Sequence, residues 1–194
     1  QARRSAAEMF ARGVTEEMQQ LSMKGGRFEV ALEACAPSEH GSEKCEFLMA
    51  GHPGVDVSPL AKVASGGELS RIGLAIFTLS SRNTTVPTLI FDEVDSGVGG
   101  ATGEVVGRMM KKLGESRQVL CVTHLPQIAA MADAEFTVEK RVEHERTYTS
   151  VLHLDDAGRR QELARLIGGS MITETTLAGA AELLRLADEA KKGI

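Results

Sequence analysis

The sequence has few aromatic residues and no segment that resembles a membrane helix. One of the 194 residues is Tyr and none is Trp. No apolar run approaches the ~18 residues that a spanning helix needs. With 42% hydrophobic and 25% charged residues, the composition is that of a soluble α/β protein. A chain of this length buries roughly 70% of its unfolded surface, and we expect a cytoplasmic location.

Cysteine is also scarce, and its pattern argues against a disulfide framework or a metal site. The count of three is odd and includes no Cys-x-x-Cys pair. Cys35, His40, Cys45 and His52 could be considered as zinc ligands, but their spacings are irregular and they span a segment expected to form a hairpin. A polar hairpin loop is therefore the favoured interpretation, and zinc is the alternative.

The phosphate-binding loop of nucleotide-binding proteins is missing as well. The sequence contains no Gly-x-x-x-x-Gly-Lys-Ser/Thr and no Gly-Lys dipeptide, so it lacks the backbone nest and the lysine that hold phosphates. The first residue is Gln1 rather than Met, and with the missing loop this predicts the C-terminal piece of a longer polypeptide. No Gly-x-Ser-x-Gly elbow occurs either, which disfavours a nucleophilic hydrolase built on Ser65 or Ser96.

The most informative segment that is present covers residues 88–97, TLIFDEVDSG. Its apolar run suits a buried strand, and ligands of open α/β sheets gather beyond the carboxyl ends of such strands. Two adjacent acids there are costly unless a cation, a water or a polar substrate satisfies them. The pattern is typical of a Walker B motif, in which Asp92 holds Mg²⁺ through its water shell and Glu93 activates the water that attacks a nucleotide γ-phosphate. The alternative is a solvated acid pair.

Two further segments accompany this one in the sequence. Residues 64–71, ASGGELSR, predict a helix with Ser65 as N-cap and Glu68 completing a capping box. A helix start preceded by glycines is a ready anion site, although an ordinary capped helix explains the pattern too. Residues 118–124, QVLCVTH, predict a second buried strand that delivers His124 to the same sheet edge as the acids. A histidine after a strand can also be a plain loop residue.

The three segments together resemble the C-terminal part of an ATP-binding-cassette ATPase head. The longer stretches VASGGELSRIGLAI, PTLIFDEVDSGVGG and VLCVTHLPQIAAMAD resemble the RecN family of bacterial DNA repair proteins, relatives of the chromosome-maintenance (SMC) ATPases. The residues that favour this family are Leu69-Ser70-Arg71 and Leu125-Pro126-Gln127. The resemblance runs from about residue 6 to residue 184.

The resemblance implies an α/β fold, the C-terminal lobe of a P-loop ATPase head with a mostly parallel sheet flanked by helices. It further implies that residues 1–23 end a coiled-coil helix and that residues 24–194 form the C-terminal part of the head. Apolar residues recur at helical spacing in the first segment, namely Ala6, Ala7, Phe10, Val14, Met18 and Leu21. A short amphipathic helix packed on the domain explains them equally well.

The resemblance also implies a mechanism and its residues. Two heads dimerise head to tail around ATP and Mg²⁺, and hydrolysis opens the dimer. The implied catalytic residues are Glu93 and His124, and Asp92 serves the metal. The remaining implied residues are the signature motif Ser65, Gly66, Gly67 and Glu68, which contacts the nucleotide of the partner head, and the D-loop Asp95, Ser96 and Gly97 at the dimer interface.

The implied partners are the N-terminal P-loop half of the same protein, a second copy through the heads, and the ends of duplex DNA. The implied role is DNA double-strand-break repair and recombination in association with the bacterial nucleoid. Two alternatives stay open: another chromosome-organising cassette ATPase, and a non-catalytic assembly module. The presence of Glu93 argues against the assembly module, because an inactive copy could lose this residue without consequence.

Charge gives no independent sign of DNA binding. The net charge of −5 and the pI near 5.6 provide no global basic field. Local basic clusters occur at Arg159, Arg160 and Arg165, and at Lys111 and Lys112. Solvated helix faces are the favoured explanation, and a phosphate or DNA contact is the alternative.

The rest of the chain predicts a regular succession of elements. We expect a hairpin, a helix after the acidic segment, a short helix, a strand pair and two final helices, at residues 27–34 with 44–50, 101–113, 127–132, 135–140 with 147–154, 158–167 and 174–191.

Overall fold

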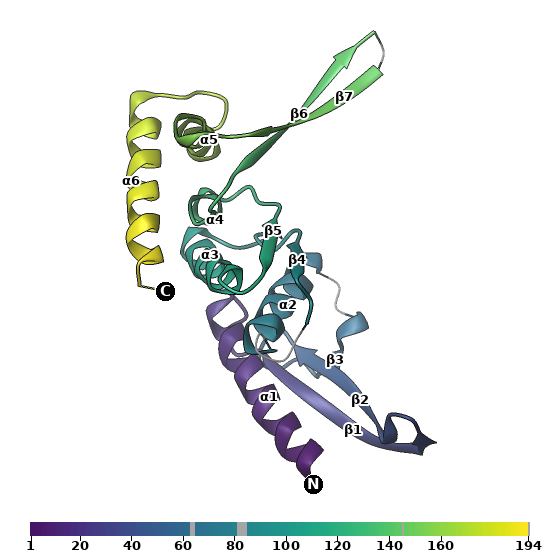
Figure 1. The fold of residues 1–194 in the computed structure, drawn as a ribbon. Helices are drawn as coiled ribbons and strands as arrows, with labels where there is room; N and C mark the ends of the chain where they lie inside the picture. The colour runs from purple at the N-terminus through teal and green to yellow at the C-terminus, as the bar shows by residue number, and fades with distance from the viewer. Residues whose placement is uncertain (63–64, 81–84, 145, 194) are drawn as a thin grey trace. The chain divides into compact units, whose positions relative to one another are not determined.

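The computed structural model describes residues 1–62, 65–80, 85–144 and 146–193 of the chain. These residues form two compact units, Gln1–Val122 and Thr123–Ile194 (Figure 1). The division does not test the predicted boundary between residues 23 and 24, which stays a prediction.

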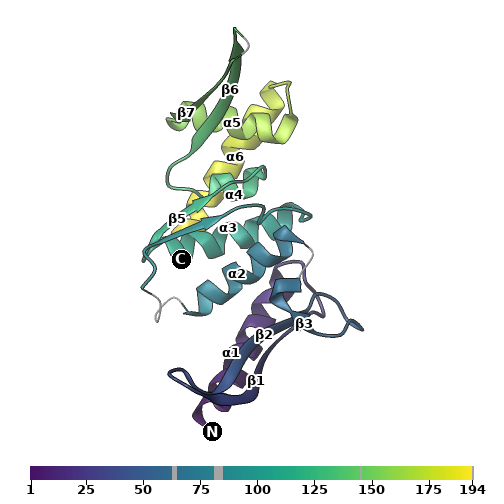
Figure 2. The same ribbon diagram turned by 90° about the vertical axis from the view of Figure 1, so that its right-hand side faces the viewer.

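The first unit begins with a helix that lies against an antiparallel sheet (Figure 2). The sheet has the strand order β1-β2-β3, and its elements are α1 (Ala2–Gln20), β1 (Arg27–Ser38), β2 (Gly41–Ala50) and β3 (Ser58–Pro59), followed by the 3₁₀ turn η1 (Leu60–Lys62). Val14 and Met18 of α1 are fully buried. The side chain of Thr15 accepts a hydrogen bond from Phe28 N at 2.9 Å, which fixes the helix on β1. The amphipathic helix is confirmed, whereas its continuation into a coiled coil stays a prediction.

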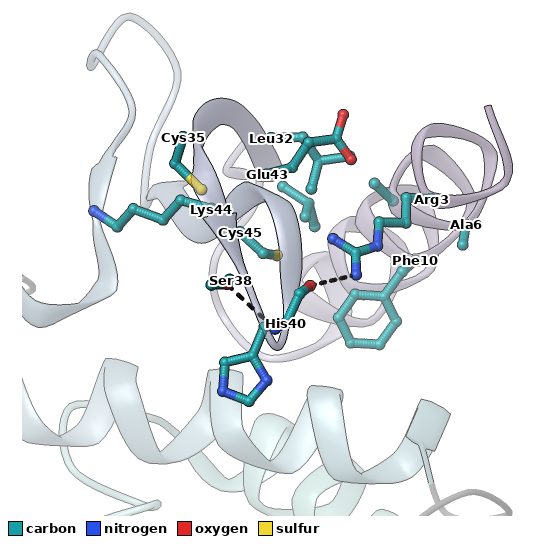
Figure 3. Close-up of a pocket in the computed structure, with 12 residues that line it drawn as sticks. Arg3, Ala6, Phe10, Leu32, Cys35, Ser38, His40, Glu43, Lys44 and Cys45 are labelled. Atoms are coloured by element: carbon teal, nitrogen blue, oxygen red, sulfur yellow. Dashed lines mark hydrogen bonds between the residues drawn. The ribbon is translucent and has the colours of Figure 1, made fainter.

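A pocket of about 690 Å³ lies between the N-terminal part of α1 and the distal end of the β1–β2 hairpin (Figure 3). Arg3 Nη2 donates to the carbonyl oxygen of His40 at 2.7 Å and ties the helix to the hairpin tip. The lining includes Cys35 and Cys45, and the imidazole of His40 points away from both sulfur atoms (Figure 3). Among the described residues, no group of three His, Cys, Asp or Glu side chains could hold a metal ion.

The second part of this unit contains a parallel strand pair. The elements are α2 (Gly66–Ser80), β4 (Thr88–Phe91), α3 (Gly100–Gly114) and β5 (Gln118–Cys121), and α3 contacts both α2 and β5. The strands pair from Thr88 with Gln118 to Phe91 with Cys121. Alternate residues of β4 point to opposite faces: Leu89 and Phe91 are 5% exposed, and Ile90 is 71% exposed. One face of the pair is therefore packed, and the other is open.

The second unit joins a hairpin to a small helical core. Its elements are α4 (Pro126–Ala130), β6 (Phe136–Glu143), β7 (Arg146–His153), α5 (Asp156–Gly168) and α6 (Glu174–Lys191). The core consists largely of small residues, with Ala130, Leu163, Ala164 and Ala180 fully buried. Because alanine side chains are small, α5 and α6 can approach each other closely.

Two of the three arginines near α5 take part in ion pairs within this unit. Arg159 Nε lies 3.4 Å from Glu135 Oε2, and its Nη2 donates to the carbonyl oxygen of Ala132 at 2.9 Å. Arg165 pairs with Glu162 at 2.6 Å. The Arg159 pair is nearly buried and therefore connects α5 to the start of β6. The alternative of a phosphate contact at this cluster stays untested.

The predicted elements and the α/β fold class are confirmed. The hairpin strands are longer than predicted, because β1 and β2 continue into the turn that the sequence marks as polar. Within the described residues the parallel pairing is confined to β4 and β5, and the other two sheets are antiparallel. No helix in the described part of the chain has the length and apolarity to cross a membrane.

Candidate functional site

The two adjacent acids lie at the carboxyl end of β4, at the start of a tight turn. Asp92 and Glu93 are both exposed. Glu93 has a φ of 56°, in the left-handed region, which costs a non-glycine residue on the order of 1–3 kcal/mol. Two hydrogen bonds hold it there: Glu93 N donates to Asp92 Oδ1, and Ser96 N donates to Glu93 O, each at 2.9 Å. Strain that the surroundings maintain at an exposed acid points to a functional residue.

The Ser-Gly-Gly segment starts α2 as predicted. Ser65 Oγ accepts from Glu68 N at 3.3 Å, which confirms Ser65 as the cap of the first turn. The Glu68 carboxylate lies near Gly51, with Oε1 3.8 Å from the position that a Cβ atom on Gly51 would take. Ala64, the first residue of the predicted segment, lies outside the described residues.

Gly66 and Gly67 at the start of α2 touch the turn of residues 92–96, which contains the two acids and is called the acidic turn. A Cβ atom on Gly66 would collide with Glu93 Oε2, so the carboxylate lies directly against this glycine. A Cβ atom on Gly67 would stand 2.9 Å from Ser96 Cβ and 3.0 Å from Glu93 O. Backbone atoms cannot yield as a flexible side chain can, so only glycine fits at position 67. The structure thus brings together two motifs that lie more than twenty residues apart in sequence.

Two polar side chains of α2 complete this junction. Ser70 Oγ donates to the carbonyl oxygen of Asp92 at 2.6 Å. Arg71 Nη1 donates to the carbonyl oxygens of Val94 at 3.3 Å and Ser96 at 2.8 Å. Both residues belong to the stretch that resembles the RecN family, and that resemblance alone predicts no structural role for either.

Arg71 is a buried cation with a buried acid nearby. Arg71 is 5% exposed and Asp95 is 3% exposed. Burial lowers the pKa of the Arg71 guanidinium, and the negative charges of Glu68 and Asp95 oppose that change. A signal for this role exists in the sequence: Arg71 stands four residues from Gly67 and from Ala75, on the buried stripe of the helix, where a charged residue is unusual.

The predicted D-loop residues divide into one buried and two exposed positions. Asp95 is buried, whereas Ser96 and Gly97 are exposed. Gly97 has a φ of 71°, which glycine adopts without strain and which turns the chain toward α3. Cys121 belongs to the same neighbourhood, because β5 pairs with β4. Burial raises the pKa of its thiol to about 12, and the charges of Asp95 and Asp92 add to that effect.

The predicted histidine belongs to the second unit. His124 is exposed and precedes α4, and next to it the side chain of Thr123 accepts a hydrogen bond from Leu125 N at 3.0 Å. The structure therefore brings the signature segment together with the acidic turn and the D-loop, all within the first unit. A contribution of His124 to that site stays a prediction.

Comparison with known proteins shows which proteins have a similar sequence. No family model matches the chain. It is 49% identical to the DNA repair protein RecN of Vibrio cholerae over 173 residues, which cover 88% of the chain and 31% of that protein. It is 46% identical to the RecN protein of Haemophilus influenzae over 186 residues, covering 95% of the chain and 33% of that protein. The chain is a segment of the RecN type. It spans about a third of the length of the relatives that it matches.

The fold of this RecN-type segment agrees with a solved structure. The Smc head domain with a coiled coil and joint from Pyrococcus yayanosii aligns with a TM-score of 0.59 and 26% identity, over 80% of the chain and 28% of that protein. The segment therefore has the fold of a part of an SMC-like head.

Proposed function

We propose that the chain is the C-terminal half of an ATP-hydrolysing head of a RecN/SMC-like protein, acting in DNA double-strand-break repair and recombination through ATP-driven head dimerisation. The observation that carries the proposal is the junction between the start of α2 and the strained acidic turn. It occurs in a chain 49% identical to a RecN protein. A plain capped helix and a solvated acid pair would not need to be joined by three side-chain hydrogen bonds.

The acids fit a nucleotide–magnesium site. Mg²⁺ is held in such sites by one or two carboxylates, with waters and substrate phosphates supplying the other ligands. Asp92 offers an exposed carboxylate at the end of β4. When bound, Mg²⁺ neutralises charge on the transferring phosphoryl group. Glu93 then orients the attacking water and accepts its proton at a carboxylate oxygen.

The signature segment serves the nucleotide of the partner head in this proposal. The first-turn N–H groups of α2 are unpaired within the helix and carry the positive end of its dipole, which suits a γ-phosphate. Ser65, Gly66 and Gly67 present them, and Glu68 follows in the same turn. Ser96 and Gly97 are exposed at the proposed dimer interface, and the neighbouring Asp95 is buried. His124 is proposed to donate a hydrogen bond to the γ-phosphate of the nucleotide that Asp92 and Glu93 serve, and to sense the loss of that phosphate.

The open face of the parallel strand pair supports the P-loop half as a partner. Ile90, Leu120 and Val122 are 71%, 45% and 63% exposed. Parallel strands are ordinarily covered on both faces. Because the chain spans about a third of its relatives' length, we propose that the N-terminal half, which carries the P-loop, covers this face.

The DNA-related role and the cytoplasmic, nucleoid-associated location rest on the RecN relatives. The net charge of −5 gives neither of them separate support. The likeness to an Smc head favours, as a second candidate, a chromosome-organising ATPase with the same chemistry. Stimulation of ATP hydrolysis by linear duplex DNA, but not by closed circular DNA, would favour the repair role.

A mixing experiment tests the proposed composite site. In the full-length protein, Ser65→Arg blocks the signature segment and Glu93→Gln removes the base, so each variant alone should be inactive. A mixed dimer contains one site with an intact Glu93 from one head and an intact Ser65 from the other. Mixing the variants should therefore restore activity, to at most about a quarter of wild type with random pairing of two heads. If mixing restores nothing although the two variants form a mixed dimer with ATP, the proposal that the two motifs meet across heads is wrong.

A further inference from the structure

The junction between α2 and the acidic turn contains more connections than either motif needs alone. Ser70 bonds the carbonyl oxygen of Asp92 at 2.6 Å. The next residue of the helix, Arg71, donates hydrogen bonds to the carbonyl oxygens of Val94 and Ser96. These two consecutive residues of one helix thus hold three carbonyl groups of a five-residue turn.

In the proposed dimer the two connected elements serve different nucleotides. The start of α2 faces the nucleotide of the partner head, whereas Asp92 and Glu93 serve the nucleotide of their own head. We infer that Ser70 and Arg71 are positioning residues that couple the two ATP sites of the head dimer, by making each signature helix move together with the acidic turn of the same head. This inference rests on the proposed function.

The burial of Arg71 explains why the two elements must move together. Arg71 is 5% exposed, and its Nε atom is buried with no hydrogen-bond partner among the described residues. A buried cation that loses its remaining partners is strongly unfavourable. If α2 shifted relative to the turn, the bonds to Val94 and Ser96 would break and leave the guanidinium unpaired. Asp95, which is buried in the same turn, supplies the opposite charge.

Steric contact removes the remaining freedom. Gly67 leaves no room between the first turn of α2 and the backbone of Glu93 and Ser96, as shown by the 3.0 Å separations from its hypothetical Cβ atom. The hydrogen bonds prevent the elements from separating, and this contact prevents them from approaching. A γ-phosphate that displaces the helix start in one site therefore displaces the acids of the other site.

The experiment measures ATP hydrolysis by the full-length protein as a function of ATP concentration. Coupled sites should give the wild type a Hill coefficient between one and two, the limit for two sites. Ser70→Ala and Arg71→Gln should lower it to about one, and Arg71→Lys should restore part of the cooperativity because it keeps the cation. Arg108→Gln is the matched control, since Arg108 is exposed and pairs with Glu104 one helical turn before it.

The outcomes separate this inference from the proposed function. If the wild type hydrolyses ATP without cooperativity, or if Ser70→Ala and Arg71→Gln leave the Hill coefficient unchanged, the coupling role is wrong and the proposed function stands. If the wild type shows no ATP hydrolysis, the proposed function itself fails. Ser70→Ala removes a single hydroxyl and keeps the buried charge, so it reports on coupling even if Arg71→Gln does not fold.

Discussion

Adding one methyl group to α2 at two glycines should have opposite effects on stability. At Gly67 a Cβ atom would stand 2.9 Å from Ser96 Cβ and 3.0 Å from the carbonyl oxygens of Glu93 and Ser96. At Gly73, inside the same helix, it would meet no atom of the described residues within 4 Å. Gly67→Ala should therefore lower the free energy of unfolding by about 1–3 kcal/mol through overpacking. Gly73→Ala should raise it by roughly 0.5–1 kcal/mol, because glycine loses more backbone entropy than alanine.

Urea unfolding followed by far-UV circular dichroism measures both changes, since the chain contains no Trp for fluorescence. Hydrogen exchange of the α2 amides assigns the effect to the first unit. Gly73→Ala is the control for the general effect of alanine in this helix. If Gly67→Ala were as stable as the wild type, or if both variants gained stability, the close contact between α2 and the acidic turn would be refuted.

The remaining predictions concern the base, a buried thiol and a buried ion pair. Glu93→Gln should abolish ATP hydrolysis in the full-length protein and retain ATP-induced dimerisation, because the amide cannot accept a proton; normal turnover would show that another group is the base. Cys121, with a thiol pKa of about 12, should resist alkylation at pH 8, where its thiolate fraction is about 10⁻⁴. The two exposed cysteines should react first, and equal labelling of all three in the folded chain would contradict this. Arg159→Met should destabilise the second unit by up to about 3 kcal/mol, since it leaves the Glu135 carboxylate buried and unpaired. Burial already raises the pKa of Glu135, so stability falls as the pH rises through that pKa, and the loss in the variant should be larger at pH 8 than at pH 5. Equal losses at both pH values in urea unfolding would refute this account of the pair.

The local features of the site could be predicted from sequence. Ser65 as a cap follows from the Ser-Gly-Gly-Glu pattern, and the strand before Asp92 follows from a short apolar run. Both depend on neighbours in the chain. The left-handed conformation of Glu93 could not be predicted, because φ > 0 at a glutamate is unfavourable by itself and depends on bonds that the folded turn supplies.

The contact between the two motifs cannot be predicted from such local patterns. That Arg71 bonds Ser96, 25 residues away, is a tertiary contact, and the sequence signals only that a charge stands on an apolar stripe. The open face at Ile90 has a similar explanation. An apolar residue in a strand predicts burial, but Ile90 is exposed in this chain. In the proposed function, the N-terminal half covers this residue.

The most direct test of the central claim, that this chain supplies half of a composite ATP site, is steady-state ATP hydrolysis by the chain alone and after it is joined to the P-loop-bearing N-terminal half. The assay is run with and without linear duplex DNA. The account predicts no hydrolysis by the chain alone, hydrolysis by the joined protein, and stimulation by DNA. A correctly folded joined protein that does not hydrolyse ATP, or equal activity of the chain alone, would contradict it.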